Sequence, residues 1–241
     1  GLAKKVKEEI KGFVFDKETG RVEASMIDIK EPSLEELKKV KEFIDTLYRW
    51  YSGSITRLNA LGVILKWSVS AAFGWVYKEM GRGETLWSPH LCGESYTGKT
   101  TLGLIGLAIW GRGREHLKSW SSYDNFYRLG EHFSNSTLPW GINEADPMIN
   151  NEIYMSVLND ALMGLVFRSK QISHRVFGDI PSLSLPIVIS QRCANVKMRR
   201  QYARRLRCIE FTRKDIIPPE KREEFEREVI DNLKVLEAVG R

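Results

Sequence analysis

Apolar residues recur at helical spacing in two stretches of the first third of the chain. Residues 34–47 carry one at about every third or fourth position, and Ser33 with Glu36 makes a capping-box pattern at the start. Residues 58–77, "LNALGVILKWSVSAAFGWVY", are almost uncharged and long enough to span a bilayer. Because Lys66 lies near the middle and no second span follows, we expect a buried helix packed against the main domain and no membrane contact.

Elsewhere the pattern changes along the chain and divides the protein into three parts. Residues 1–12 have the pattern of a short basic helix, and residues 13–29 that of a hairpin that turns at Thr19–Gly20. After residue 84, apolar strand candidates alternate with helix candidates, and "LSLPIVISQR" (183–192) is the most convincing strand. The predicted parts are an N-terminal helical region with a small hairpin (1–82), an α/β core with a parallel sheet flanked by helices (83–217) and a C-terminal charged helix (218–241).

The composition is that of a soluble globular protein. Hydrophobic residues make up 42% and charged residues 28%, which favours a folded chain over a disordered one. The net charge of +6 is a mild excess that suits a polyanionic partner. The three cysteines show no CxxC spacing, so we expect neither a disulfide framework nor a zinc site, and we favour a cytoplasmic location. Because the chain begins with Gly1, we expect it to be a piece of a longer protein.

The stretch "CGESYTGKTT" fits the phosphate-loop pattern G-x-x-x-x-G-K-[ST]. In such a loop the backbone N–H groups face the phosphates of a nucleotide, and the helix that follows adds the positive end of its dipole. The apolar run "TLGLIGLAIW" provides that helix, although an ordinary turn that caps a helix is the alternative. We expect Lys99 to bind the phosphates of ATP and Thr100 to bind Mg²⁺. The predicted nucleotide-binding residues are Gly93, Glu94, Ser95, Tyr96, Thr97, Gly98, Lys99, Thr100 and Thr101.

A phosphate loop needs an acidic residue at the end of a neighbouring strand, and "TLPWGINEAD" (137–146) is the best candidate. We expect Glu144 to activate the water that attacks ATP. Asn143 stands where an aspartate is usual, which weakens the binding of Mg²⁺, and Asp146 could partly compensate. A surface turn is the alternative, because asparagine, aspartate and proline favour turns. The predicted metal-binding residues are Thr100, Asn143 and Asp146.

Two further features fit an ATPase. Strand 183–192 ends in Ser190 and Gln191, and a polar residue there can sense the γ-phosphate, with a plain polar strand end as the alternative. Beyond it, the run "MRRQYARRLRCIEFTR" holds six arginines, of which three share one face if the run is helical. An arginine that reaches a neighbouring subunit stabilises the transferring phosphoryl group, whereas binding of a nucleic-acid backbone or plain solvation are the alternatives. The shared face is Arg200, Arg204 and Arg207, and the finger candidates are Arg204 and Arg205.

Between the acidic motif and the polar strand lies a basic stretch, "FRSKQISHRVFGDIPSLS". Its basic residues are interleaved with apolar ones, which suits a hairpin that contacts a DNA backbone in the channel of a ring. A solvated connection is the alternative. The four histidines of the chain are scattered, and we expect no metal site among them. The predicted nucleic-acid-binding residues are Arg168, Lys170, His174 and Arg175.

The order of these parts resembles the helicase modules of archaeal plasmid and viral replication proteins, which are related to superfamily-3 helicases within the AAA+ class. The resemblance covers roughly residues 55–215, and the phosphate loop is its specific element. It implies an AAA+-like P-loop NTPase fold and a hexameric ATPase ring that moves along single-stranded DNA, often fused to a primase or polymerase. By the match of motifs it implies nucleotide binding by Lys99 and Thr100, water activation by Glu144, a sensor role for Gln191 and a trans-acting Arg204 or Arg205.

Three functions compete at this point. A DNA-translocating ATPase of a mobile element is the leading hypothesis. A nucleotide switch with slow or absent hydrolysis is the second, and Asn143 favours it. A small-molecule kinase or a packaging ATPase is the third, although neither a lid nor an acceptor pocket is evident in the sequence.

Overall fold

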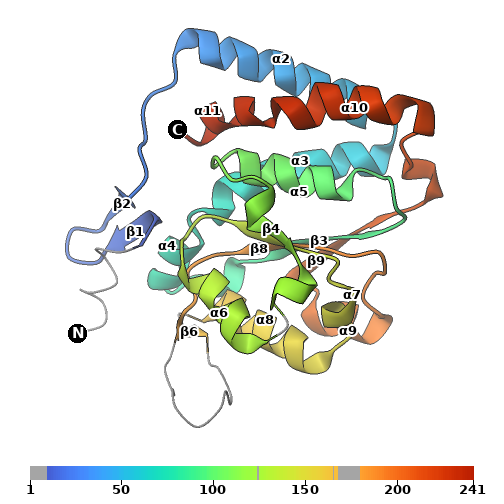
Figure 1. The fold of residues 1–241 in the computed structure, drawn as a ribbon. Helices are drawn as coiled ribbons and strands as arrows, with labels where there is room; N and C mark the ends of the chain where they lie inside the picture. Colours follow the sequence, from blue (N-terminus) through green and yellow to red (C-terminus); the bar gives the residue numbers. More distant parts are fainter. Residues whose placement is uncertain (1–9, 124, 165, 168–179) are drawn as a thin grey trace.

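A parallel β-sheet of five strands forms the centre of the computed structural model, which describes residues 10–123, 125–164, 166–167 and 180–241 (Figure 1). Every neighbouring pair of strands in this sheet is parallel. The three central strands are almost entirely buried, which is usual for parallel sheets and confirms the predicted α/β architecture. In spatial order the strands are β4 (Leu117–Ser119), β5 (Trp140–Asn143), β8 (Pro186–Ile189), β3 (Ser88–Gly93) and β9 (Leu206–Phe211).

Helices cover both faces of this sheet (Figure 1). On one face lie α3 (Ile55–Ala71) and α5 (Lys99–Ala108), and the other N- and C-terminal helices stack beyond them. Those outer segments are α2 (Leu34–Tyr51), α10 (Arg222–Val229), the 3₁₀ segment η7 (Ile230–Leu236) and α11 (Glu237–Gly240). The opposite face carries α6 (Phe126–Ser134), α7 (Asp146–Ile149), α8 (Glu152–Met163) and α9 (Val196–Tyr202).

The almost uncharged stretch at residues 58–77 packs against the core of the molecule, as predicted. Gly106 of α5 lets α3 approach closely, because a Cβ at this position would lie 2.9 Å from the Ile64 side chain. The Ser68 hydroxyl on α3 donates to the Gly106 carbonyl. The stretch is divided between α3 and α4 (Gly74–Glu79). Among the described residues, no helix is both long and apolar enough to cross a membrane.

The N-terminal predictions are confirmed except at one boundary. The Ser33 hydroxyl accepts from the Glu36 N–H (3.2 Å) and the Glu36 carboxylate accepts from the Ser33 N–H (2.8 Å), which completes the capping box of α2. The hairpin is formed by β1 (Gly12–Asp16) and β2 (Arg21–Ser25). A helix that extends to residue 12 is wrong, because Gly12 already belongs to β1; residues 1–9 lie outside the described part.

The C-terminal tail departs from the single charged helix that we expected. It consists of the 3₁₀ segment η6 (Pro219–Lys221), then α10, then η7, then the short α11. In η7 the apolar residues Ile230, Leu233 and Leu236 follow one another at intervals of three, which matches the three residues per turn of a 3₁₀ helix. This spacing places all three on one side, and the segment packs against α5.

One hydrophobic cluster includes residues from all three predicted parts of the chain. Leu47 of α2, Ile105 of α5 and Val229 of α10 belong to it, and all three side chains are buried. The core is therefore continuous across the chain. The proposed part boundaries at residues 82 and 217 stay predictions.

The basic stretch that we expected to contact DNA is bracketed by two short strands. β6 (Val166–Phe167) pairs antiparallel with β7 (Ile180–Pro181). This pairing brings the two ends of the stretch together. The candidate residues Arg168, Lys170, His174 and Arg175 themselves lie outside the described residues.

The expectation that the cysteines form no disulfide is wrong. Cys92 at the end of β3 and Cys193 beyond β8 are disulfide-bonded, with their Cα atoms 5.0 Å apart. The spacing of 101 residues hid this pair, because it depends on two parallel strands that come together only in the fold.

Gly93, the last residue of β3, lies where the backbones of β3 and β9 come closest. Its φ of +111° is in a region that side chains rarely adopt, and a Cβ there would lie 2.0 Å from the Phe211 carbonyl oxygen. The next residue, Glu94, donates its N–H to that same carbonyl (3.0 Å). A glycine is therefore required by the sheet itself, apart from any role in binding.

We expect Gly93→Ala to lower the free energy of unfolding by about 3 kcal/mol, because backbone strain and a clash with Phe211 add together. The matched control is Gly20→Ala in the hairpin turn, which has a φ of +68° but open space around it. Its cost should be about 1 kcal/mol, the strain alone. Urea unfolding of both variants provides the comparison, and equal losses would contradict the close approach.

Candidate nucleotide-binding site

The predicted phosphate loop connects β3 to α5 in the arrangement that such a loop requires. β3 runs to Gly93 and α5 begins at Lys99, so the N–H groups of the first helical turn point toward the loop. Gly98 adopts a left-handed conformation with φ of +83°, and Tyr96 has a φ of +60°. The Thr97 hydroxyl donates to the Glu94 carbonyl (2.9 Å) and closes the loop. The residues before the loop, which have only a weak strand pattern in the sequence, form strand β3 of the sheet.

Backbone carbonyls of the loop hold the side chain of Lys99. The side chain is buried, and its Nζ donates to the carbonyls of Gly93 (2.8 Å) and Glu94. Burial lowers the pKa of Lys99, while the carboxylates of Glu94 and Asp146 oppose that shift. These acceptors are carbonyl oxygens, and phosphate oxygens can replace them with a stronger, charge-assisted hydrogen bond.

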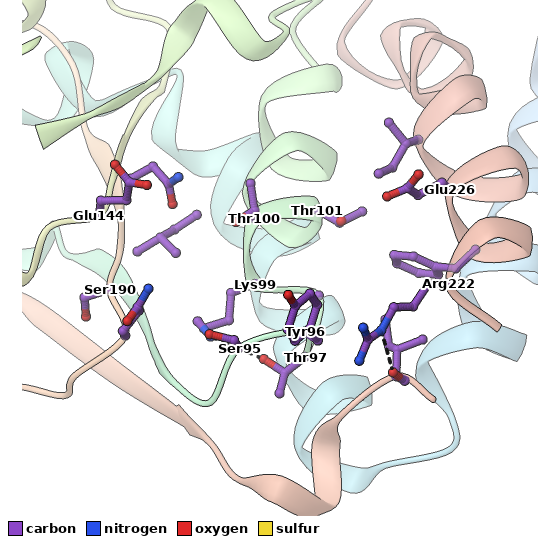
Figure 2. Close-up of a pocket in the computed structure, with 17 residues that line it drawn as sticks. Ser95, Tyr96, Thr97, Lys99, Thr100, Thr101, Glu144, Ser190, Arg222 and Glu226 are labelled. Carbon is purple, nitrogen blue, oxygen red and sulfur yellow. Dashed lines mark hydrogen bonds between the residues drawn. The ribbon is translucent and has the colours of Figure 1, made fainter. Parts of the chain in front are cut away.

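A cavity of about 420 Å³ opens in front of this loop (Figure 2). Loop residues from Ser95 to Thr101 line one side, and Asn143, Glu144 and Gln191 line another. The fold therefore brings together the phosphate loop, the end of β5 and the end of β8, as the sequence predicted. Gly93 and Glu94 lie at a neighbouring hollow.

Glu144 follows directly after β5 and lines the cavity. Its φ of +54° is unusual for a residue with a side chain, and the carboxylate accepts a hydrogen bond from the Ser119 hydroxyl. Ser119 ends β4, the strand beside β5, so it occupies the equivalent edge position. Sequence reasoning missed Ser119, since nothing in "LKSWSS" marks a serine as a partner of Glu144.

Asp146 ties the end of β5 to the segment after β8. Its two carboxylate oxygens accept from the backbone N–H groups of Gln191 (3.0 Å) and Arg192 (2.7 Å). The residue does not line the cavity, whereas Asn143 and Thr100 do. These hydrogen bonds give Asp146 a positioning role, and its predicted role as a ligand of Mg²⁺ stays a prediction.

The two polar residues at the end of β8 differ in their surroundings. Ser190 is buried, donates its hydroxyl to the Arg192 carbonyl (2.6 Å) and is hydrogen-bonded to His90 Nε2 (2.7 Å). Gln191 is exposed, and both residues line the cavity. Of the two sensor candidates, Gln191 is therefore better placed to contact a bound phosphate, because the Ser190 hydroxyl is already engaged inside the protein.

The wall opposite the catalytic candidates comes from the C-terminal segment, which sequence reasoning missed. The Arg222 guanidinium lies 3.9 Å from the centre of the Tyr96 ring, and its Nε donates to the Ile217 carbonyl (3.2 Å). The Ile217 N–H donates in turn to the Tyr96 carbonyl (2.9 Å). Figure 2 shows Arg222 beside Tyr96, and both residues line the cavity. The other wall residues are Phe225, Glu226 and Ile230.

The arginine run is not one helix. α9 ends at Tyr202, so Arg204 and Arg205 lie in the turn before β9 and Arg207 lies in that strand. The shared helical face of Arg200, Arg204 and Arg207 is therefore wrong. The reason is that the run must turn back to supply the edge strand of the sheet.

The two finger candidates have different surroundings. Arg205 is buried and its Nη1 donates to the carbonyls of Leu86 (3.1 Å) and Glu84, which ties the turn to the segment before β3. Arg204 is exposed. The side chain of a trans-acting arginine must be free to extend into the site of a neighbouring subunit. The surroundings therefore favour Arg204 over Arg205 as the finger candidate.

No protein-family model matches this chain, and no curated protein sequence does. A solved structure described as "SCCmec type IV Cch - active helicase" aligns with a TM-score of 0.56 and 14% identity, over 92% of this chain and 43% of that one. This alignment shows a shared fold.

Two structures of the NrS-1 C-terminal region in its apo A form align with TM-scores of 0.47 and 0.48. Their identities are 13% and 15%, over 97% and 95% of this chain and 53% and 51% of theirs. These scores do not establish a shared fold. The chain spans about half or less of the length of the solved structures that it matches.

The hydrogen bonds of Asp146 predict a loss of stability that needs no metal. We expect Asp146→Ala to lower the free energy of unfolding by about 2 kcal/mol, because two backbone N–H groups lose a charged acceptor. Asp146→Asn keeps one acceptor oxygen and should lose about half as much. Thermal unfolding in a chelator is the measurement. Unchanged stability in both variants would show that the carboxylate does not hold the end of β8.

Proposed function

We propose that this chain is the ATP-hydrolysing module of a DNA-translocating helicase from a mobile-element replication protein, and that it acts as a hexameric ring. The observation that carries the proposal is the convergence on one cavity of Lys99, Glu144 and Gln191, which lie in the segments that follow three different strands. These are the groups that phosphoryl transfer to water requires: a cation for the phosphates, a base for the water and a polar sensor.

The residues around the cavity have defined tasks in this proposal. Lys99 exchanges its two carbonyl acceptors for phosphate oxygens, and the α5 N-terminus adds its dipole. Glu144 orients and deprotonates the attacking water, and Gln191 contacts the γ-phosphate. Thr100 and Asn143 line the same cavity and offer the oxygen ligands that Mg²⁺ prefers. When bound, Mg²⁺ neutralises the charge that develops on the phosphates.

The C-terminal wall completes the nucleotide site. Tyr96 and Arg222 lie on the side of the loop that faces α10, away from Glu144 (Figure 2). With the phosphates at Lys99 and the reacting end toward Glu144, the nucleoside of ATP is placed against this stacked pair. Aromatic and guanidinium groups are suited to bases because both present flat, polarisable faces.

The nucleic-acid part of the proposal depends on charge and on the helicase fold. The net charge of +6 suits a polyanion, and single-stranded DNA is the proposed partner. Arg204 is exposed and can serve a neighbouring subunit in a ring. The solved structure with the shared fold is itself described as an active helicase, which supports the proposal by analogy.

A nucleotide switch with slow hydrolysis is the second candidate. Asn143 cannot supply the negative charge of the usual aspartate, and the Glu144 carboxylate is bonded to Ser119. Both features reduce the rate of hydrolysis without affecting the phosphate loop. In a switch, ATP binding would change the association with a partner and turnover would be incidental.

Steady-state ATP hydrolysis with and without single-stranded DNA tests the motor. We expect DNA to raise turnover severalfold, and Lys99→Ala to abolish it because the phosphates lose their cation. Turnover that DNA does not change would favour the switch.

Glu144→Gln is the companion variant, since it should bind ATP normally while hydrolysis falls by about a hundredfold or more. Hydrolysis equal to that of the wild type would show that Glu144 is not the base.

Arg222→Ala should weaken ATP binding about tenfold, because the nucleoside loses one of its two stacking partners. The matched control is Arg227→Ala, which removes the same charge from the exposed surface of α10 away from the cavity. Binding of a fluorescent ATP analogue measures both. Equal affinities in the two variants would place the nucleoside elsewhere.

A further inference from the structure

All three cysteines of the chain and one histidine meet behind the phosphate loop, on the face of the sheet opposite α5. His90 and Cys92 are two residues apart on β3, so their side chains emerge on the same face. Cys208 on β9 pairs directly with His90 in the parallel register. Cys193 follows β8 and is bonded to Cys92.

The ligand atoms of this group are close enough to share one ion. Cys92 Sγ lies 3.1 Å from Cys208 Sγ. A ring nitrogen of His90 and the sulfurs of Cys92 and Cys208 all lie within 4.8 Å of one another. A tetrahedral zinc ion with bonds of about 2.0–2.3 Å holds its ligands roughly 3.4–3.8 Å apart. Only small side-chain movements are needed to bring these ligand atoms from their present positions to the separations of a zinc site.

The hydrogen bond between His90 and Ser190 decides which ring nitrogen of His90 has a lone pair for an ion. The one hydroxyl proton of Ser190 is donated to the Arg192 carbonyl (2.6 Å), so toward His90 the Ser190 oxygen can only accept. His90 Nε2 therefore carries the proton, and Nδ1 presents its lone pair. Nδ1 is buried and has no hydrogen-bond partner in the described part of the chain. A metal-binding histidine is held in the same way, with its other nitrogen donating to an oxygen.

We propose that His90, Cys92, Cys193 and Cys208 form a zinc site when the three cysteines are thiols. The disulfide employs two of the four groups and leaves His90 Nδ1 without a partner and the Cys208 thiol with a weak hydrogen bond to Cys92 Sγ, whereas a Cys₃His site employs all four groups. A phosphine reductant supplies two electrons to the Cys92–Cys193 bond and becomes a phosphine oxide, while water supplies the oxygen and the two thiol protons. Zinc then replaces the three thiol protons, which are released to solvent.

A zinc ion here would join three segments of the candidate nucleotide site. Cys92 immediately precedes Gly93 of the phosphate loop, and Cys193 lies two residues beyond Gln191. Cys208 belongs to β9, the strand that Gly93 approaches most closely. The ion would therefore fix the start of the loop relative to the end of β8, and the inference does not depend on ATP hydrolysis.

The test measures zinc in protein prepared with a phosphine reductant and without chelator. We expect one zinc per chain, and substitution by Co²⁺ should give the absorption bands of a tetrahedral, thiolate-bound ion. Cys208→Ser should bind zinc about tenfold more weakly or worse, while the fold persists because serine is nearly the size of cysteine and Cys208 is only partly buried. Ser190→Ala should weaken binding by about tenfold, because His90 loses the oxygen that orients it.

His116→Ala is the control, because His116 precedes β4 at the opposite edge of the sheet from β9, and its loss should leave the zinc content unchanged. Circular dichroism confirms that each variant is folded. The proposal is overturned if reduced wild type holds no zinc, if Co²⁺ shows no thiolate bands, or if Cys208→Ser binds zinc as tightly as the wild type.

Discussion

Backbone hydrogen bonds that continue past the ends of the parallel strands hold the candidate site together. The Ser190 N–H donates to the Leu91 carbonyl (3.0 Å), and the Ala145 N–H donates to the Ile189 carbonyl (2.9 Å). Each of these bonds joins the segment that follows one strand to the strand beside it. Because parallel strands end at the same edge, these segments meet although they are far apart in sequence. Asp146 extends the same arrangement with a side chain.

The C-terminal segment is attached to the same edge of the sheet through the phosphate loop. The phosphate loop presents the carbonyl of Tyr96, a residue with positive φ, to the Ile217 N–H. The chain then continues into α10, whose Arg222 lies over the Tyr96 ring. The loop and the wall are therefore fixed to each other by backbone and side chain together. Under the proposed function, a change in the loop conformation on phosphate binding would reach α10 through these contacts.

Much of this arrangement could be predicted from local patterns. The glycines and Lys99 of the loop, the apolar run of β8 and the capping box at Ser33 each depend on neighbours in sequence, and the structure places them as expected. The predictions that were wrong depend on distant contacts. Arg205 looks like part of a charged helix, yet it is buried against the Leu86 carbonyl because the chain must turn back into β9.

The same reasoning explains why the cysteine cluster left no signal in the sequence. Metal motifs are recognised by short spacings, but here the pairing of β3 with β9 and the end of β8 brings the groups together. A buried ring nitrogen without a partner costs about 1–3 kcal/mol. An apolar side chain at position 90 would avoid this cost. It would also match the other positions of β3, which are apolar or small. In the proposed zinc site, the ion at His90 Nδ1 removes this cost and accounts for a buried histidine at this position.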